Sequence, residues 1–467
     1  MASKLLYLEG VRGIAAFIVL QLHSLRLYNK PLKNFFMLYQ EWSFAVPIFF
    51  ILSGRVLTLS ALKKNNPNGI FSSVIKRPFR LTMPLIGVMI VALIMYQLGT
   101  FVILDKCPEA PGFCAASDKV AQSFYELIMK PFLYICNSSL FQSNANELPL
   151  PITAWTLPLE YANSNYVYLL SLVLIHLSGN YHARWLVLIG ALVMTIYTHL
   201  WTSHFVVGVI FAEMANTGTF DKIKASKITP IFNILLLALG VFLAIDSPYS
   251  IGGKSHDWIK QYQVDHRLKF GAWETYDDAS ERPFVLLLSA VIMFIIETTD
   301  FLQWMFGSAP CVFLGRISYM CYLFHPFFNY SVQPRIVDAL DPKTVSGQIL
   351  IPLICTTLVL LISEVLVRLF DEPTLVVIRH MYKAIFVKDW TSKKSDGLGS
   401  LPKPNMEGPS VSAIEAKRSM SNIHSVVGSS TTQMNQTQSS SVVIDQMPRG
   451  RSLDRRTNEA NDRQVHY

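Results

Sequence analysis

The sequence predicts an all-α membrane protein, a polytopic bundle of about ten transmembrane helices followed by a disordered polar C-terminal tail. Of the 467 residues 51% are hydrophobic and only 15% are charged, whereas soluble chains carry about 25% charged residues. The mean hydropathy is positive, at +0.34. Apolar runs of about 17 to 25 residues recur along the chain, and that length crosses a bilayer as a helix. This pattern excludes an ordinary cytosolic enzyme.

The apolar runs and the charged breaks between them place the individual helices. We expect them at 8–27, 43–62, 81–104, 157–178, 184–201, 203–217, 228–246, 283–300, 312–332 and 348–370. The sixth run is short, so the pair 184–217 can be divided in another way. These helices form one membrane domain over 1–387. From 388 to 467 the chain is rich in Ser, Thr, Asn, Gln and charge, which predicts a disordered cytoplasmic tail.

Lysine and arginine set the expected orientation. The segment 63–80 holds five basic residues and no acidic one, so it should lie in the cytoplasm. Ten spans then put both termini in the cytoplasm, in the plasma membrane or an endomembrane. The loop 105–156 falls on the opposite side, where Cys107 and Cys114 could form a disulfide and Asn137 begins a glycosylation sequon. The net charge of +8 reflects these basic loops and does not indicate a nucleic-acid partner.

The first predicted span carries two polar residues on one face. Arg12 and His23 are eleven residues apart, close to three full helical turns, with an axial separation of roughly 16 Å. Glu9, one turn before Arg12, can pair with it. Since an imidazole can accept a proton near neutral pH, this face suggests a polar channel with a base at one end and an anion anchor at the other. The alternative is a snorkelling arginine and a hydrogen-bonded core histidine.

Two further groups of polar residues stand at the ends of predicted spans. Arg77 and Arg80 share a helix face and could grip phosphates, or they could be the ordinary basic anchor at a cytoplasmic helix end. Glu160 lies just inside the expected outer end of the span 157–178. A lone carboxylate at this position should face a cavity, unless it caps the helix at the membrane interface.

The ninth predicted span combines charge, aromatic hydroxyls and an imidazole. Arg316 and Tyr319 begin it, and Tyr322 and His325 follow before Pro326. Arg316 could simply snorkel at the helix end. His325 could bond a backbone carbonyl that Pro326 leaves without its donor, so the span alone does not decide between a site and a core role.

Five motifs in this order resemble those of the acyltransferase-3 family of integral membrane acyltransferases, over about residues 4–385. They are Tyr7 to Ala16 with the Arg12-x10-His23 spacing, Val46 to Gly54, Arg77-x-x-Arg80, Trp155-Thr156-Leu157 with Glu160, and Leu314 to Pro326. Each motif alone is weak, but together they are specific.

The resemblance implies O-acylation, commonly acetylation, of a carbohydrate, lipid or small-molecule hydroxyl at the lipid bilayer. The implied donor is an acyl-CoA, acetyl-CoA above all, as a co-substrate rather than a permanently bound cofactor. By the same resemblance His23 is the catalytic base and Arg12 lines its channel. Arg77 and Arg80, with Arg12, bind the CoA phosphates at the cytoplasmic face.

By the same resemblance, the remaining motif residues should lie on the acceptor side. Glu160 would orient His23 or line the acceptor site, and we expect Tyr319, Tyr322 and His325 to bind the acceptor. Arg55 departs from the family pattern, which has an aromatic or aliphatic residue there, and could add a donor contact. We expect no metal site, because His199 and His204 have poor spacing for zinc and no Cys-x-x-Cys occurs. The competing hypothesis is a polytopic transporter that uses Arg12, His23 and Glu160 as a proton or substrate path.

Overall fold

The fold is known from a computed structural model that describes residues 6–26, 44–65, 67–100, 125–136, 152–198, 200–244, 282–341 and 344–387. Every regular element in these ranges is a helix, which confirms the all-α prediction. The predicted tail 388–467, the pair Cys107 and Cys114, and the sequon at Asn137 lie outside the described residues.

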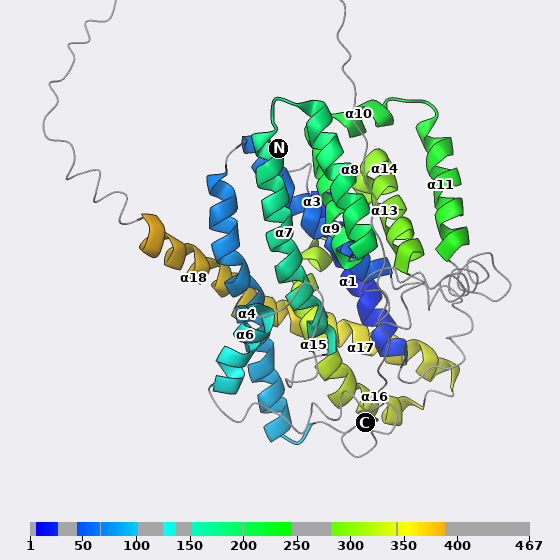
Figure 1. Cartoon of the computed structure of the whole chain (residues 1–467). Helices are drawn as coiled ribbons and strands as arrows, with labels where there is room; N and C mark the ends of the chain where they lie inside the picture. The colour runs from blue at the N-terminus through cyan, green and yellow to red at the C-terminus, as the bar shows by residue number, and fades with distance from the viewer. Residues whose placement is uncertain are drawn as a thin grey trace, which may run out of the picture. The chain divides into compact units, whose positions relative to one another are not determined.

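A long helix overlaps each of the ten predicted segments (Figure 1). In chain order these are α1 (Leu6–Arg26), α3 (Ala45–Lys64), α4 (Asn68–Gln97), α7 (Thr156–His176), α8 (Tyr181–Thr198), α9 (Leu200–Asn216), α11 (Thr229–Ala244), α13 (Arg282–Thr298), α15 (Ala309–Ser331) and α17 (Val345–Leu366). Shorter elements join them: η4 (Tyr125–Met129), α6 (Lys130–Cys136), η6 (Ile152–Trp155), α10 (Thr219–Lys224), α14 (Asp300–Phe306), α16 (Gln333–Leu340), η8 (Val367–Asp371), α18 (Glu372–Tyr382) and η9 (Lys383–Val387).

Several of these helices suit a bilayer by length and composition. Within the described ranges four are long and apolar enough to cross it: Leu6–Ser24, Ala45–Lys63, Gly69–Gln97 and Val345–Phe386. A fifth span is formed if α13 and α14, which meet at a bend of 97°, count as one. The number of about ten spans therefore stays a prediction.

The third helix begins earlier than the sequence suggested. The prediction started it at 81 and read 63–80 as a loop, but α4 begins at Asn68 and only the short segment around Asn65 separates it from α3. Pro78 lies inside this helix, and the hydroxyl of Thr82 donates to its carbonyl oxygen at 2.8 Å. Arg77 and Arg80 consequently lie well inside a 30-residue helix rather than at its mouth.

The first helix runs beside α15 in the same direction. A Cβ atom on Gly13 would lie 2.3 Å from the Gly315 nitrogen, and one on Gly315 would lie 2.2 Å from the Glu9 carbonyl oxygen. Further along, the Ser24 hydroxyl donates to the Asn329 side-chain oxygen at 3.3 Å. The two backbones therefore touch, and residues along α1 meet residues along α15 in increasing order.

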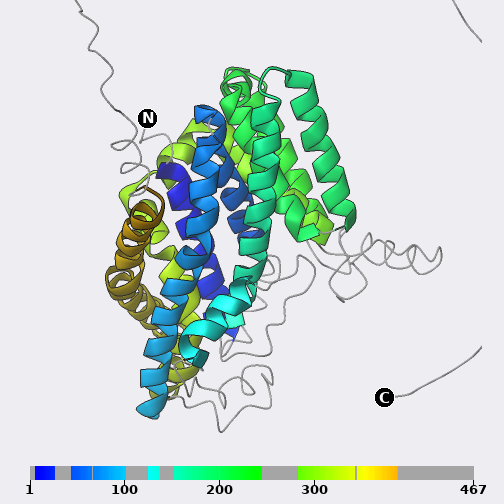
Figure 2. The same cartoon turned by 60° about the vertical axis from the view of Figure 1, so that its left-hand side comes forward.

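A second close pair forms around α3, which packs against α7 and α9 as well as α1. Gly54 and Gly208 bring α3 and α9 together, because a Cβ atom on either would lie 2.1 Å from a carbonyl oxygen of the other helix. Figure 2 shows α4 running the length of the bundle beside the gold C-terminal helices, and α18 is among its contacts. Together α1, α3, α4, α7 and α15 surround the site.

Candidate active site

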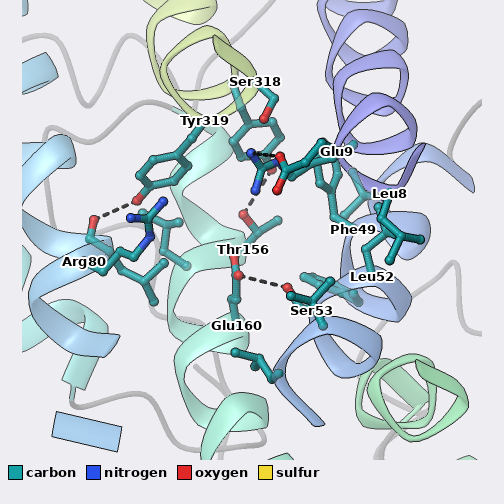
Figure 3. A pocket seen from close by; sticks show the side chains of 18 of the residues that line it. Leu8, Glu9, Phe49, Leu52, Ser53, Arg80, Thr156, Glu160, Ser318 and Tyr319 are labelled. Carbon is teal, nitrogen blue, oxygen red and sulfur yellow. Dashed lines mark hydrogen bonds and ion pairs between the residues drawn. The ribbon is translucent and has the colours of Figure 1, made fainter. Parts of the chain in front are cut away.

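A cavity of about 190 Å³ lies between α1, α3, α4, α7, α15 and η8 (Figure 3). Its wall combines apolar side chains with an unusual number of ionisable ones. The charged residues of the lining are Glu9, Arg12, Arg77, Arg80, Glu160, Arg316 and Asp371. Ser53, Thr156, Ser318, Tyr319 and Tyr322 add hydroxyl groups. Six of the eight predicted site residues line this one cavity, although they come from four different helices: Arg12, Arg77, Arg80, Glu160, Tyr319 and Tyr322.

An ion pair connects α4 and α7 across the cavity. Arg77 Nη2 lies 2.7 Å from Glu160 Oε1, and the Ser53 hydroxyl from α3 donates to the same oxygen at 3.1 Å. Figure 3 shows Ser53 and Glu160 facing each other. The sequence placed Arg77 at the inner end of one span and Glu160 at the outer end of another, yet the two side chains meet. Glu160 bonds Arg77 and Ser53 rather than His23, so the structure does not show it orienting that imidazole.

Arg12 is held between its own helix and α15. Its Nη2 atom donates to the Gly315 carbonyl oxygen at 2.8 Å and lies 2.6 Å from Glu9 Oε2, the partner expected from the spacing. Arg316 pairs with carboxylates at the edge of the cavity, those of Glu364 and Glu372. These three arginines of the lining, Arg77 included, therefore each have a carboxylate partner within the chain.

Arg80 differs from the other arginines of the cavity. No hydrogen bond or ion pair joins its guanidinium to another residue of the described ranges, and Figure 3 shows it beside Tyr319. The hydroxyl of Tyr319 donates to the Leu81 carbonyl oxygen at 2.7 Å. The guanidinium N–H groups of Arg80 are therefore not hydrogen-bonded to another residue of the described ranges and can bind a ligand in the cavity.

Asp371 is a cavity residue that the sequence reasoning missed. It is 8% exposed and its Oδ1 atom has no hydrogen-bond partner in the described structure. The predicted span 348–370 ended one residue before it, because charge at the end of an apolar run was read as a boundary. The signal was available, since charge at the edge of a span can equally mark a group that faces a polar cavity.

His23 and His325 lie outside the cavity lining but next to each other. Their ring centroids are 5.2 Å apart with an interplanar angle of 43°. Tyr322 links this histidine pair to the cavity: its ring centroid is 6.2 Å from that of His325, and its hydroxyl bonds the Thr156 hydroxyl at 3.1 Å. The predicted base and the predicted anion anchors therefore stand on either side of Tyr322.

Arg55 does not reach the cavity, so the donor contact considered for it is absent. Its Nε atom lies 2.9 Å from Glu297 Oε1, and the two side chains are only 3% and 4% exposed. The hydroxyl of Tyr7 donates to the other carboxylate oxygen at 2.7 Å. Glu297 was not singled out in the sequence, although a carboxylate inside a predicted span was itself the signal. This buried network ties α3 and α13 to α1.

No group of three or more His, Cys, Asp or Glu side chains in the described part of the chain is arranged to hold a metal ion.

An all-helical bundle with apolar spans and a polar interior cavity defines a membrane protein with a site among its helices. A family model described as an acyltransferase domain matches residues 5–368, most of the described helices. The chain belongs to this family, the acyltransferase-3 family, and is a membrane acyltransferase. No curated protein and no solved structure matches the chain.

Proposed function

We propose that the protein transfers an acyl group, acetyl in the simplest case, from acyl-CoA to a hydroxyl of a carbohydrate, lipid or small-molecule acceptor. The acceptor oxygen attacks the thioester carbonyl and forms an ester while the carbon–sulfur bond breaks. His23 removes the proton of the attacking hydroxyl, and the departing CoA thiolate takes up a proton. The products are the ester and free CoA, and no serine or cysteine nucleophile is needed.

The observation that carries the proposal is Arg80, the guanidinium of the cavity that lacks an internal acceptor. Guanidinium groups bind phosphate oxygens through paired, charge-assisted hydrogen bonds. Arg77 and Arg12 line the same cavity, so a donor with several phosphates would find cations on more than one wall. The cytoplasm is the source of CoA, and this agrees with the basic segment predicted to face it.

The position of the two histidines relative to Arg80 indicates how acyl-CoA would be oriented in the cavity. Tyr322 and Phe49 line the cavity with their rings 5.9 Å apart, and Tyr322 also contacts His325. A phosphate-bearing head bound at Arg80 would direct its long pantetheine arm past these rings. The thioester would then reach His23, where the acceptor arrives from the other side of the membrane.

Calorimetry of the purified protein in detergent with acetyl-CoA tests the donor site. Arg80→Gln should weaken binding by about 10- to 100-fold, since a hydrogen bond to a charged group contributes about 1.5–3 kcal/mol. His23→Ala should bind acetyl-CoA like the parent but lose transfer. Arg335→Gln is the control, because Arg335 does not line the cavity and its guanidinium donates to the Gly99 carbonyl oxygen at 3.4 Å.

The outcomes separate the hypotheses. If the parent protein binds no acyl-CoA, the donor proposal is wrong and a proton-coupled transporter becomes the better account of Arg12, His23 and Glu160. If Arg80→Gln and Arg335→Gln bind equally well, a donor site exists but is not this cavity.

A further inference from the structure

The imidazole of His325 has a determined tautomer. Its Nδ1 atom lies 2.9 Å from the Cys321 carbonyl oxygen, and a carbonyl oxygen can only accept a hydrogen bond. Nδ1 must therefore carry the hydrogen. In the neutral ring Nε2 is then left with a lone pair, so this atom is an acceptor.

The Nε2 atom of His325 receives no hydrogen bond in the described structure. The His325 side chain is 0% exposed, and Nε2 has no hydrogen-bond partner in the described structure. A buried polar atom without a partner costs about 1–3 kcal/mol, and native proteins seldom leave one without a reason. The neighbouring polar group is the ring of His23, whose centroid is 5.2 Å away.

The two rings lie close enough that a small rotation of either one would bring their nitrogens within hydrogen-bond distance. An N–H···N contact of about 2.9 Å, with each nitrogen about 1.1 Å from its ring centroid, spans about 5.1 Å. The local frame also keeps the rings together. Gln333 donates to the Ser24 carbonyl oxygen at 2.7 Å and Ser24 donates to Asn329, so α1 is tied to the chain around α15 one residue beyond His23.

We propose that His325 is a positioning residue for His23. A small rotation of the rings lets its Nε2 atom accept the ring N–H of His23, so the other ring nitrogen of His23 directs its lone pair at the acceptor hydroxyl. When His23 takes the hydroxyl proton it becomes an imidazolium, and the same contact to neutral His325 stabilises that charge. A base oriented by a third group is the arrangement that nucleophile activation commonly requires. This role replaces the acceptor-binding one expected from the sequence and rests on the proposed function.

Two variants of similar size test the proposal kinetically. His325→Gln keeps an acceptor near the Nε2 position, whereas His325→Met fills the same space without one. Turnover of acetyl-CoA, with water and glycerol as hydroxyl donors, gives kcat and KM for each. We expect kcat to fall by about 100- to 10,000-fold in His325→Met and to recover at least tenfold in His325→Gln. The dissociation constant of acetyl-CoA should change less than about threefold in both.

A second measurement keeps the test independent of turnover. Magnetic resonance of protein labelled with ¹⁵N-histidine reports which ring nitrogen of His23 is protonated, in the parent and in the two variants. One tautomer in the parent, retained in His325→Gln and mixed in His325→Met, supports the proposal. Equal tautomer populations in His325→Met and the parent would overturn it. So would a raised KM for glycerol with kcat unchanged, which would return His325 to acceptor binding. Failure of the proposed function is recognised separately, by the absence of acetyl-CoA binding in calorimetry.

Discussion

The carboxylate of Glu160 forms an ion pair with the guanidinium of Arg77, to which a phosphate of the proposed ligand would also bind. Arg77 donates to it at 2.7 Å, and both side chains are partly buried, at 14% and 24% exposure. A bound polyanion would therefore compete with an acid of the protein itself. The strength of this competition determines how much of the positive charge of Arg77 is available to the donor.

Glu160→Gln should tighten acetyl-CoA binding by about 3- to 10-fold. The substitution removes a negative charge beside the expected phosphate position and releases Arg77 from a part-exposed pair worth about 1 kcal/mol. Calorimetry measures the change. Ser53→Ala is the matched control, because it removes the other hydrogen bond to the same oxygen without changing charge. Weaker binding in Glu160→Gln would mean that Glu160 holds Arg77 in its binding geometry instead.

Single residues also show the limits of sequence reasoning. Arg12 and Glu160 could be named in advance because charge inside a membrane span is costly and needs a reason, and Arg77 and Arg80 because their spacing puts them on one helix face. That rule does not identify the partner of each charge. For Arg55 a donor contact or an effect on selectivity was considered, because nothing in the sequence reveals that Glu297, 242 positions away, folds against it.

At the scale of whole helices, the close contact between α1 and α15 requires a glycine at position 315. A side chain on Gly315 would collide with the Glu9 backbone, and the Gly315 carbonyl oxygen accepts from Arg12. The spacing between the two helices therefore controls both their packing and the position of a cavity arginine. Histidines further along the same two helices depend on the same register.

Gly315→Ala should destabilise the protein by about 1–3 kcal/mol, the usual cost of overpacking a tight contact, and should lower acyl transfer as well. Thermal unfolding in detergent and turnover of acetyl-CoA measure the two effects. Gly190→Ala in α8 is the control: its Cβ atom would meet nothing within 4 Å, so alanine should raise stability by about 0.5–1 kcal/mol through helix propensity. Equal stability of the two variants would contradict a backbone contact at Gly315.

The existence of the helices was predictable from the long apolar runs, but their boundaries were not. The basic stretch before 81 was read as a loop because charge normally marks the end of a span. In the structure α4 includes Lys76, Arg77 and Arg80 and continues through Pro78. Contacts with residues distant in the sequence stabilise these charges within the helix: Glu160 pairs with Arg77, and Lys76 lies 4.0 Å from the Tyr382 ring centroid.

For the molecule as a whole, α4 provides a test of orientation. Its 30 residues span about 45 Å, more than the hydrocarbon core of about 30 Å, so its two ends should emerge on opposite sides. Asn65 precedes it and is exposed, and Leu98 follows it and is 72% exposed.

Impermeant maleimide applied to intact cells should label Leu98→Cys from outside and Asn65→Cys only after permeabilisation. Each cysteine is placed in a chain whose native cysteines are replaced. The expectation follows from the basic residues around the turn between α3 and α4. The reverse labelling pattern would show that the protein has the opposite orientation. CoA could then not enter the cavity from the cytoplasm as proposed, whatever the calorimetry shows.

The pairing of the cavity arginines has a consequence for the protein at rest. Arg12, Arg77 and Arg316 each have a carboxylate counter-ion from the chain, so little of their positive charge is uncompensated, and an uncompensated cation among membrane helices is costly. Under the proposed function, Arg80 is the one cavity arginine without an ion-pair partner in the described ranges, so it can bind a phosphate directly. Each further phosphate must displace a carboxylate of the protein from its arginine. A ligand with a single phosphate would gain one such contact, while CoA could continue the exchange. Discrimination among cytoplasmic anions would then come from the number of exchanges a molecule can complete.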